Sequence, residues 1–171
     1  MKSAAMTLLA SGALLAQAPD LKTASGYARM IQAQLKSNVV KSAEKMPQES
    51  YAFKPSHDVR SFGELLGHIA NSEYYFCSAM LGEKSPSTVN IEKEKTTKAD
   101  LTESVKGAFD YCEKAYASMS DDKAAETVKV GNNERNKLGI LNFNNAHTFE
   151  HYGNLVTYMR IRGLVPPSSE R

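Results

Sequence analysis

The sequence has no tryptophan, only two cysteines and no marked excess of charge of one sign. Among its 171 residues, 21 are Lys or Arg and 19 are Asp or Glu, so the formal net charge is +2. Two cysteines cannot form a disulfide framework or a cysteine-rich zinc site. Because no basic run stands beside aromatic residues, we expect no nucleic-acid partner and no binding to a membrane surface. The hydrophobic fraction of 42% is ordinary for a soluble globular domain.

Several catalytic motifs are also missing. The absence of H-E-x-x-H excludes a standard zincin metalloprotease. The sequence contains no G-x-S-x-G, P-loop or G-x-G-x-x-G motif, which excludes the corresponding serine hydrolases and nucleotide-binding proteins. The length is sufficient for one domain with a hydrophobic core but not for two large domains.

The N-terminus has the three parts of a secretory signal peptide. Lys2 provides a positive start, residues 4–16 are apolar or small, and an A-x-A cleavage sequence follows. The apolar stretch is too short to span a bilayer comfortably. We therefore expect a signal peptide over residues 1–18, a single domain over residues 19–171, and a periplasmic or secreted protein with no membrane attachment after cleavage. The alternative is that the segment extends the first helix.

Cys77 and Cys112 allow two interpretations. In an oxidising compartment, one disulfide between two helices becomes possible. The two residues show no C-x-x-C spacing, so neither a zinc knuckle nor a thioredoxin-like motif is indicated. We expect two buried, reduced cysteines.

Hydrophobic residues recur at helical spacing in four stretches, which predicts an all-α four-helix bundle with one longer crossover connection. The expected helices cover residues 22–46, 61–81 and 97–118, and a last stretch from residues 136–138 to residue 163. Residues 82–96 are polar and contain proline, so we expect a surface linker there. Residues 126–133 predict a short strand or hairpin, too small to make a sheet by itself.

The ends and faces of these helices are indicated by particular residues. Ser61 and Glu64 form a capping box at the start of the second helix, and Pro47 ends the first. At 100° per residue, the apolar stripe of the first helix includes Tyr27 and that of the last helix includes Phe149.

Three histidines are the candidate metal ligands. His147 and His151 stand at i and i+4, so on a helix their imidazoles can reach one ion. They lie outside the polar arc of the last helix. His68 lies at the edge of the apolar stripe of the second helix, from where it could meet them in a bundle. The alternative is that each is an ordinary core or surface histidine. His57 lies in a polar loop, and we expect it to be exposed.

Glu73 falls within the apolar stripe of the second helix. A carboxylate in such a position needs a partner when it is buried. We expect a buried salt bridge to a basic residue of a neighbouring helix rather than a catalytic role, because Glu73 projects away from His68.

Two segments give the chain a resemblance to a known family. The first is Y-x-F-x-P at residues 51–55 followed by VRSFGELLGHIA at residues 59–70, and the second is HxxxHYGNLVTYMRxxGxxPP at residues 147–167. With the helical pattern between them, the sequence resembles the DinB/YfiT-like superfamily of metal-dependent enzymes. One departure is Tyr152 with Asn154, where members of the family often have H-R-G-Q. This difference concerns the pocket more than the metal site.

The resemblance implies a four-helix bundle with a three-histidine metal site. The matching ligands are His68 from the second helix and His147 and His151 from the fourth. Bound metals in the family include nickel, zinc and iron, and members are often dimers, so we expect a divalent ion and a homodimer. Some relatives transfer low-molecular-weight thiols to electrophiles.

These observations predict an exported metal-dependent hydrolase of a small-molecule substrate. Three imidazoles leave a coordination position open for water, whose pKa a bound zinc ion lowers to about 7. The alternatives are a metal-dependent thiol S-transferase and a non-catalytic metal-binding or stress-associated bundle. The side chains that could assist catalysis are Glu64, Asn144, Glu150 and Tyr158, and none of them is assigned as the general base.

Overall fold

A computed structural model describes residues 18–170 of the chain. The predicted signal peptide therefore lies outside the described residues, apart from residue 18. Within the described range, no helix has both the length and the apolar character needed to cross a bilayer.

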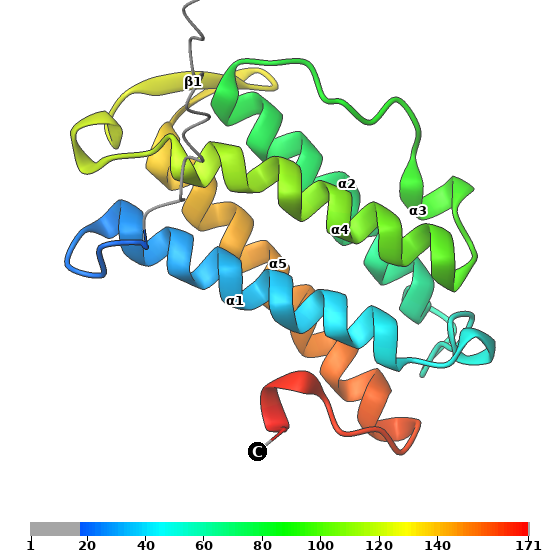
Figure 1. Ribbon diagram of the computed structural model, residues 1–171. Coiled ribbons are helices and arrows are strands. Elements are labelled where there is room, and N and C mark those ends of the chain that lie inside the picture. Colours follow the sequence, from blue (N-terminus) through cyan, green and yellow to red (C-terminus); the bar gives the residue numbers. More distant parts are fainter. Residues whose placement is uncertain (1–17, 171) are drawn as a thin grey trace, which may run out of the picture.

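The structure is the expected all-α bundle of four long helices (Figure 1). The elements are α1 (Ala24–Lys45), α2 (Phe62–Leu81), α3 (Ile91–Glu94), α4 (Lys98–Ala117), β1 (Thr127–Val130), β2 (Asn133–Asn136) and α5 (Lys137–Ile161). Each of α1 and α2 packs against both α4 and α5, which closes the four long helices around one core. The antiparallel pair of β1 and β2 confirms the expected hairpin, and its turn begins at Gly131 with a φ of 59°.

The predicted caps explain why α2 has these ends. The side chain of Ser61 accepts a hydrogen bond from the backbone N–H of Glu64, and the Glu64 carboxylate accepts one from the backbone N–H of Ser61. A capping interaction of this kind contributes about 1 kcal/mol to helix stability. Gly82 then ends the helix with a φ of 70°, a conformation that favours glycine. These ends place His68 in the second turn of α2.

The buried stripes of α1 and α5 differ from the predicted ones. In α1 the stripe runs through Ala28, Gln32, Leu35 and Val39, and it leaves Tyr27 52% exposed. In α5 the buried positions include many polar side chains, and Phe149 is 44% exposed. The buried polar residues of α5 are Asn144, Asn145, Thr148 and His151. The predicted apolar residues Leu141, Leu155 and Met159 are buried, but between them the middle of the helix turns polar side chains toward the bundle, which the apolar pattern did not indicate.

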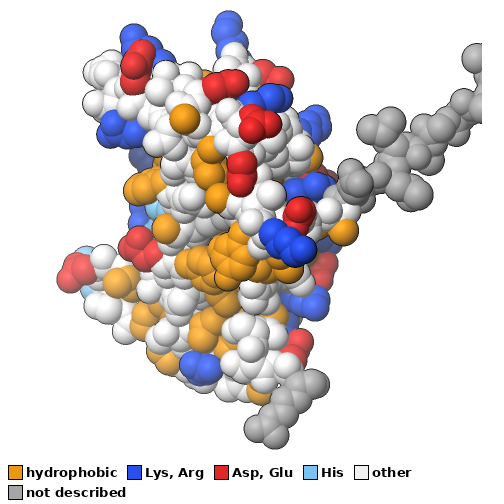
Figure 2. Space-filling model, turned by 90° about the vertical axis from the view of Figure 1, so that its left-hand side faces the viewer, with side chains coloured by type: hydrophobic (Ala, Val, Ile, Leu, Met, Phe, Trp, Pro, Cys, Tyr) orange, Lys and Arg blue, Asp and Glu red, His pale blue; other side chains and the backbone are white. Residues whose placement is uncertain are grey.

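Some large hydrophobic side chains remain on the surface, and Figure 2 shows hydrophobic side chains gathered across the middle of one face. Charged side chains lie above and below this region (Figure 2). Single exposed hydrophobic residues are common in soluble proteins and carry no functional conclusion by themselves.

The connection over residues 82–96 is more ordered than a surface linker. It contains α3, whose Ile91 is buried and whose backbone lies directly against α2. At Gly67 a Cβ atom would lie 2.5 Å from the Cα of Glu92, so a larger residue would force α3 away. The absence of a side chain at Gly67 therefore allows Glu92 to approach α2.

Cys77 of α2 and Cys112 of α4 form a disulfide, so the expectation of two reduced cysteines is wrong. Their Cα atoms are 5.2 Å apart, within the range that disulfides require. The sequence could place each cysteine on the inward side of its helix, but it could not show that they lie at the same level of the bundle.

Candidate metal centre

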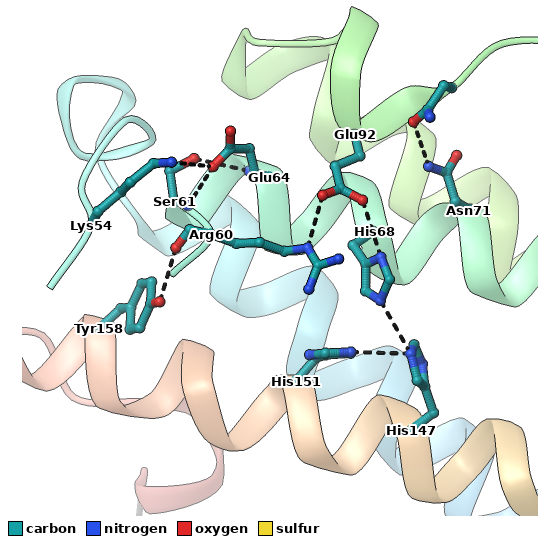
Figure 3. A network of polar contacts seen from close by, with 11 residues as sticks. Lys54, Arg60, Ser61, Glu64, His68, Asn71, Glu92, His147, His151 and Tyr158 are labelled. Atoms are coloured by element: carbon teal, nitrogen blue, oxygen red, sulfur yellow. Dashed lines mark hydrogen bonds and ion pairs between the residues drawn. The ribbon is translucent and has the colours of Figure 1, made fainter. Parts of the chain in front are cut away.

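The three candidate histidines lie together between α2 and α5 (Figure 3). The Nε2 atoms of His68 and His147 are 3.2 Å apart, and those of His147 and His151 are 3.1 Å apart. Coordinating nitrogens of all three lie within 4.8 Å of one another. The prediction that His68 meets the other two is therefore confirmed.

This spacing suits a metal ion. Two nitrogens on a tetrahedral zinc ion, with bonds of about 2.0 Å, are about 3.3 Å apart. The separations of 3.2 and 3.1 Å within the cluster are close to that value. Imidazole nitrogens are ligands for zinc, nickel, copper and iron, so the donor set fits several divalent ions.

Glu92 orients the imidazole of His68. The Nδ1 atom of His68 lies 3.1 Å from Oε2 of Glu92. An ionised carboxylate only accepts hydrogen bonds, so Nδ1 carries the proton and the lone pair of Nε2 points toward the other two histidines. Metal-binding histidines are commonly held by a carboxylate in this manner.

Burial keeps the other two histidines uncharged near neutral pH. It lowers the pKa of His151 to about 4, with further lowering by the charges of His147 and His68. Burial, followed by the charge of His68, also lowers the pKa of His147. Their Nδ1 atoms are buried and have no hydrogen-bond partner among the described residues. A neutral imidazole offers a lone pair to a metal, so both residues are in the form that binds one.

One histidine of the cluster, His151, lines a cavity of about 550 Å³. Its wall includes His151 together with charged and polar side chains from the connection before α2 and from α2, α3 and α5. These include Lys54, Arg60, Glu64, Glu92, Glu150 and Tyr158. Small molecules can therefore reach His151 from solvent through a polar chamber.

The other side of the cluster is aromatic. The Phe143 ring stacks on that of His147 with the ring centroids 6.4 Å apart, and the Phe76 centroid lies 6.0 Å from it. A second cavity, of about 390 Å³, lies beside these two rings. Its wall is formed by aromatic and aliphatic residues together with Asn133, Arg135 and Asn136.

Two of the predicted catalytic side chains are occupied by other contacts. The Glu64 carboxylate pairs with Nζ of Lys54 at 3.0 Å besides accepting its capping hydrogen bond. The Ser61 backbone hydrogen bond, followed by that from Lys54, lowers the Glu64 pKa. The Tyr158 hydroxyl donates to the Arg60 carbonyl at 2.9 Å, and burial raises its pKa.

Glu150 and Asn144 have opposite surroundings. Glu150 is exposed and lines the charged chamber. Asn144 is fully buried and lies outside this chamber, where its Nδ2 donates to Oε2 of Glu73 at 3.0 Å. The prediction that Asn144 could assist at the metal site is not supported by this position.

Glu73 has no basic partner among the described residues, so the predicted buried salt bridge is wrong. Its carboxylate accepts hydrogen bonds from Gln32 at 2.7 Å, Asn144 at 3.0 Å and Thr148 at 2.8 Å. Burial raises the Glu73 pKa to about 7, against the opposing effect of these hydrogen bonds. The α5 residues that serve it lie on the polar face that the sequence pattern did not reveal.

Sequence reasoning missed the role of Glu92 and of Arg60. Glu92 was placed in a surface linker, yet it contacts both His68 and Arg60. The available signal was Ile91, an apolar residue within a charged stretch, which could have indicated that the segment packs on the bundle. His57 is exposed, as predicted, with a 99% exposed side chain.

A comparison with protein-family models identifies the family of the chain. The DinB superfamily model matches residues 33–155, which is most of the chain and includes all three histidines of the cluster. The protein therefore belongs to the DinB superfamily. A comparison with curated proteins finds no match.

Proposed function

We propose that this member of the DinB superfamily is an exported, metal-dependent hydrolase of a small-molecule substrate. His68, His147 and His151 would hold one divalent ion, which would be zinc, nickel or iron. The observation that carries the proposal is the convergence of three imidazole nitrogens beside an open cavity, with the Nε2 atoms 3.1 and 3.2 Å apart. When bound, the ion would supply an activated water and polarise the substrate.

The surrounding residues would have separate roles in this reaction. Glu92 holds the proton on Nδ1 of His68 and keeps Nε2 free for the metal. Glu150 would act as the proton acceptor, because neither a hydrogen bond nor an ion pair occupies its carboxylate within the described residues. Glu64 and Tyr158 are held by contacts outside the cluster and would shape the chamber instead.

Two observations support export. Residues 1–18 have the composition of a signal peptide. The Cys77–Cys112 disulfide is of the kind that persists in oxidising compartments such as the periplasm. Export also favours hydrolysis over thiol transfer, because low-molecular-weight thiols are cytoplasmic. We further propose a homodimer, which sedimentation would test, and a periplasmic or secreted location, which cell fractionation would test.

The central experiment measures metal content and turnover together. The mature chain is purified without chelators, its metal is quantified, and a panel of hydrolase substrates is assayed beside a thiol-conjugation reaction. We expect one ion per chain and hydrolysis, both lost in His147→Ala. The matched control for metal content is His57→Ala, because the His57 side chain is 99% exposed and, among the described residues, its hydrogen bond is to Asp58 rather than to the cluster. Glu150→Gln should retain the ion and lose turnover.

The other outcomes identify the alternatives. Conjugation without hydrolysis would establish a thiol S-transferase. One ion per chain with no turnover in either assay would favour a non-catalytic metal-binding bundle. Equal metal content in His147→Ala and in the unaltered chain would contradict the proposed site itself.

A further inference from the structure

Arg60 is held at both ends beside the histidine cluster. Its backbone carbonyl accepts a hydrogen bond from the Tyr158 hydroxyl at 2.9 Å. Its Nε donates to Oε1 of Glu92 at 2.8 Å. The side chain therefore extends from the residue before α2 along the wall of the charged chamber, and it is held by contacts with α3 and α5 (Figure 3).

The same carboxylate joins Arg60 to the candidate metal ligands. While Oε1 of Glu92 accepts from Arg60, Oε2 lies 3.1 Å from Nδ1 of His68. Figure 3 shows the guanidinium projecting from Glu92 toward His151. The guanidinium is thus close enough to act on a molecule bound at the cluster.

The outer edge of the guanidinium is available. Arginine offers five N–H donors in a planar fork, and Glu92 is contacted through Nε alone. Within the described residues, no hydrogen bond or ion pair engages the two Nη atoms. The Arg60 side chain is 41% exposed and lines the chamber together with His151. Two parallel donors therefore face the space that a substrate would occupy.

We propose that Arg60 recognises a carboxylate on the substrate of this site, an inference that rests on the proposed metal-dependent function. Two parallel N–H donors match the two oxygens of a carboxylate. Glu64 and Glu150 also line the chamber, and their negative charges repel a dianion more than a monoanion. A carboxylate therefore fits this chamber better than a phosphate. Lys54, the other cation, is paired with Glu64.

A pair of matched probes tests this role without knowledge of the substrate. The full chain is loaded with cobalt(II) and titrated with succinic monohydroxamate and with the terminal amide of the same compound. Both probes present a hydroxamate to the metal, and only the first carries a carboxylate. Binding is followed by the visible absorption of cobalt(II), so the measurement does not depend on turnover.

The expected result is a preference for the acid that depends on Arg60. The unaltered protein should bind the acid about tenfold more tightly than the amide, as expected for a charge-assisted bidentate contact. Arg60→Gln should bring the ratio close to one without changing the affinity for the amide. Arg60→Lys should retain part of the preference, because it keeps the charge and loses the fork.

Controls separate this inference from the metal site. Cobalt content and helical circular dichroism establish that the Arg60 variants fold and bind the ion. Equal binding of acid and amide by the unaltered protein would overturn the role of Arg60 and leave the metal site intact. Loss of the preference in Lys54→Gln but not in Arg60→Gln would also overturn it. Cobalt uptake that does not depend on His147 would instead refute the proposed function.

Discussion

Two groups of side chains in the bundle contain similar residue types and differ in chemistry: the histidine cluster joins α2 and α5, and the second group joins α2 and α4. The histidine cluster and the group of Glu73, Cys77 and Cys112 each bring three side chains of metal-binding type within 4.8 Å. The sulfurs of the second group are joined in a disulfide, and its carboxylate is surrounded by neutral donors. The histidine cluster keeps converging lone pairs beside an open chamber. Proximity of suitable residue types therefore does not define a metal site, whereas free donor atoms and solvent access do.

The second group (Glu73, Cys77 and Cys112), which we call the Glu73 cluster, also differs in the protonation of its acidic side chain. Besides the donors to the carboxylate, Oε1 of Gln32 and Oδ1 of Asn144 are buried and have no hydrogen-bond partner among the described residues. A protonated Glu73 could donate to one of these oxygens if the amide group were turned. With a pKa of about 7, Glu73 can hold that proton near neutral pH.

The largest contrast between the clusters should appear in metal binding. His151→Ala removes one of three ligands, and we expect metal uptake to be abolished while helix content stays near that of the unaltered chain. Equilibrium dialysis with zinc and circular dichroism measure the two effects. If His151→Ala fails to fold, His151 has a structural role that the metal-site interpretation does not include.

The Glu73 cluster should instead contribute to stability through its disulfide. The bond joins residues separated by 35 positions, and closing a loop of this length corresponds to about 4 kcal/mol of unfolding free energy in the chain-entropy estimate. Replacing both Cys77 and Cys112 by Ala should lower the denaturation midpoint in urea accordingly. Zinc affinity measured on the folded double variant should remain unchanged, and a large loss would mean that the clusters are coupled.

The buried carboxylate gives a prediction for the pH dependence of stability. Because the Glu73 pKa is raised from 4.5 to about 7, the folded state binds a proton that the unfolded state has released between these values. The unfolding free energy should therefore fall as pH rises from about 4.5 to about 7, by about 3 kcal/mol at most. The measurement is urea denaturation of the unaltered chain and of Glu73→Gln at several pH values. The contribution of Glu73 is the difference between the two unfolding free energies at each pH.

In the metal-free protein, the histidine cluster changes the unfolding free energy with pH in the opposite direction. The His151 pKa is lowered from 6.5 to about 4, so the unfolded state binds more protons in this range and the contribution to stability rises with pH. Because both proteins contain His151, its contribution cancels in the comparison with Glu73→Gln. If the unfolding free energy of the unaltered chain rose with pH relative to that of Glu73→Gln, the assignment of a raised pKa to Glu73 would be wrong.

The smallest effect on metal binding should come from changing Glu92, whose carboxylate orients His68. Glu92→Gln removes the charge from the acceptor of the Nδ1 proton, and we expect metal affinity to fall by about 10- to 100-fold. Competition with a chromophoric chelator measures the change. Glu94→Gln is the control, because Glu94 lies on the same short helix and, among the described residues, its carboxylate accepts a hydrogen bond from the backbone N–H of Asn90 rather than contacting the cluster. An equal loss in both variants would point to a general effect of charge.

The comparison also shows which parts of the structure the sequence could predict. The ends of α2 were predictable because Ser61 and Gly82 act through local backbone chemistry. The pairing of His147 with His151 followed from helical spacing, and His68 followed from its place at the edge of an apolar stripe together with the family resemblance. Such features depend on short-range rules or on motifs that occur in the chain itself.

The errors share a different cause. The disulfide and the partners of Glu73 depend on which levels of separate helices meet, which periodicity does not report. Glu92 acts at the cluster only because Gly67 lets α3 approach. The polar inward face of α5 violates the assumption that buried stripes are apolar, and that assumption hid Asn144 and Thr148.

The disulfide has a consequence for proteolysis. The exposed residues 83–86 lie between Cys77 and Cys112, so a cut after Lys84 would leave two fragments that are still covalently linked. One fragment would carry His68, and the other would carry His147 and His151. A nicked, two-chain form of the protein would thus keep all three imidazoles tethered in one molecule until a reductant separates the halves.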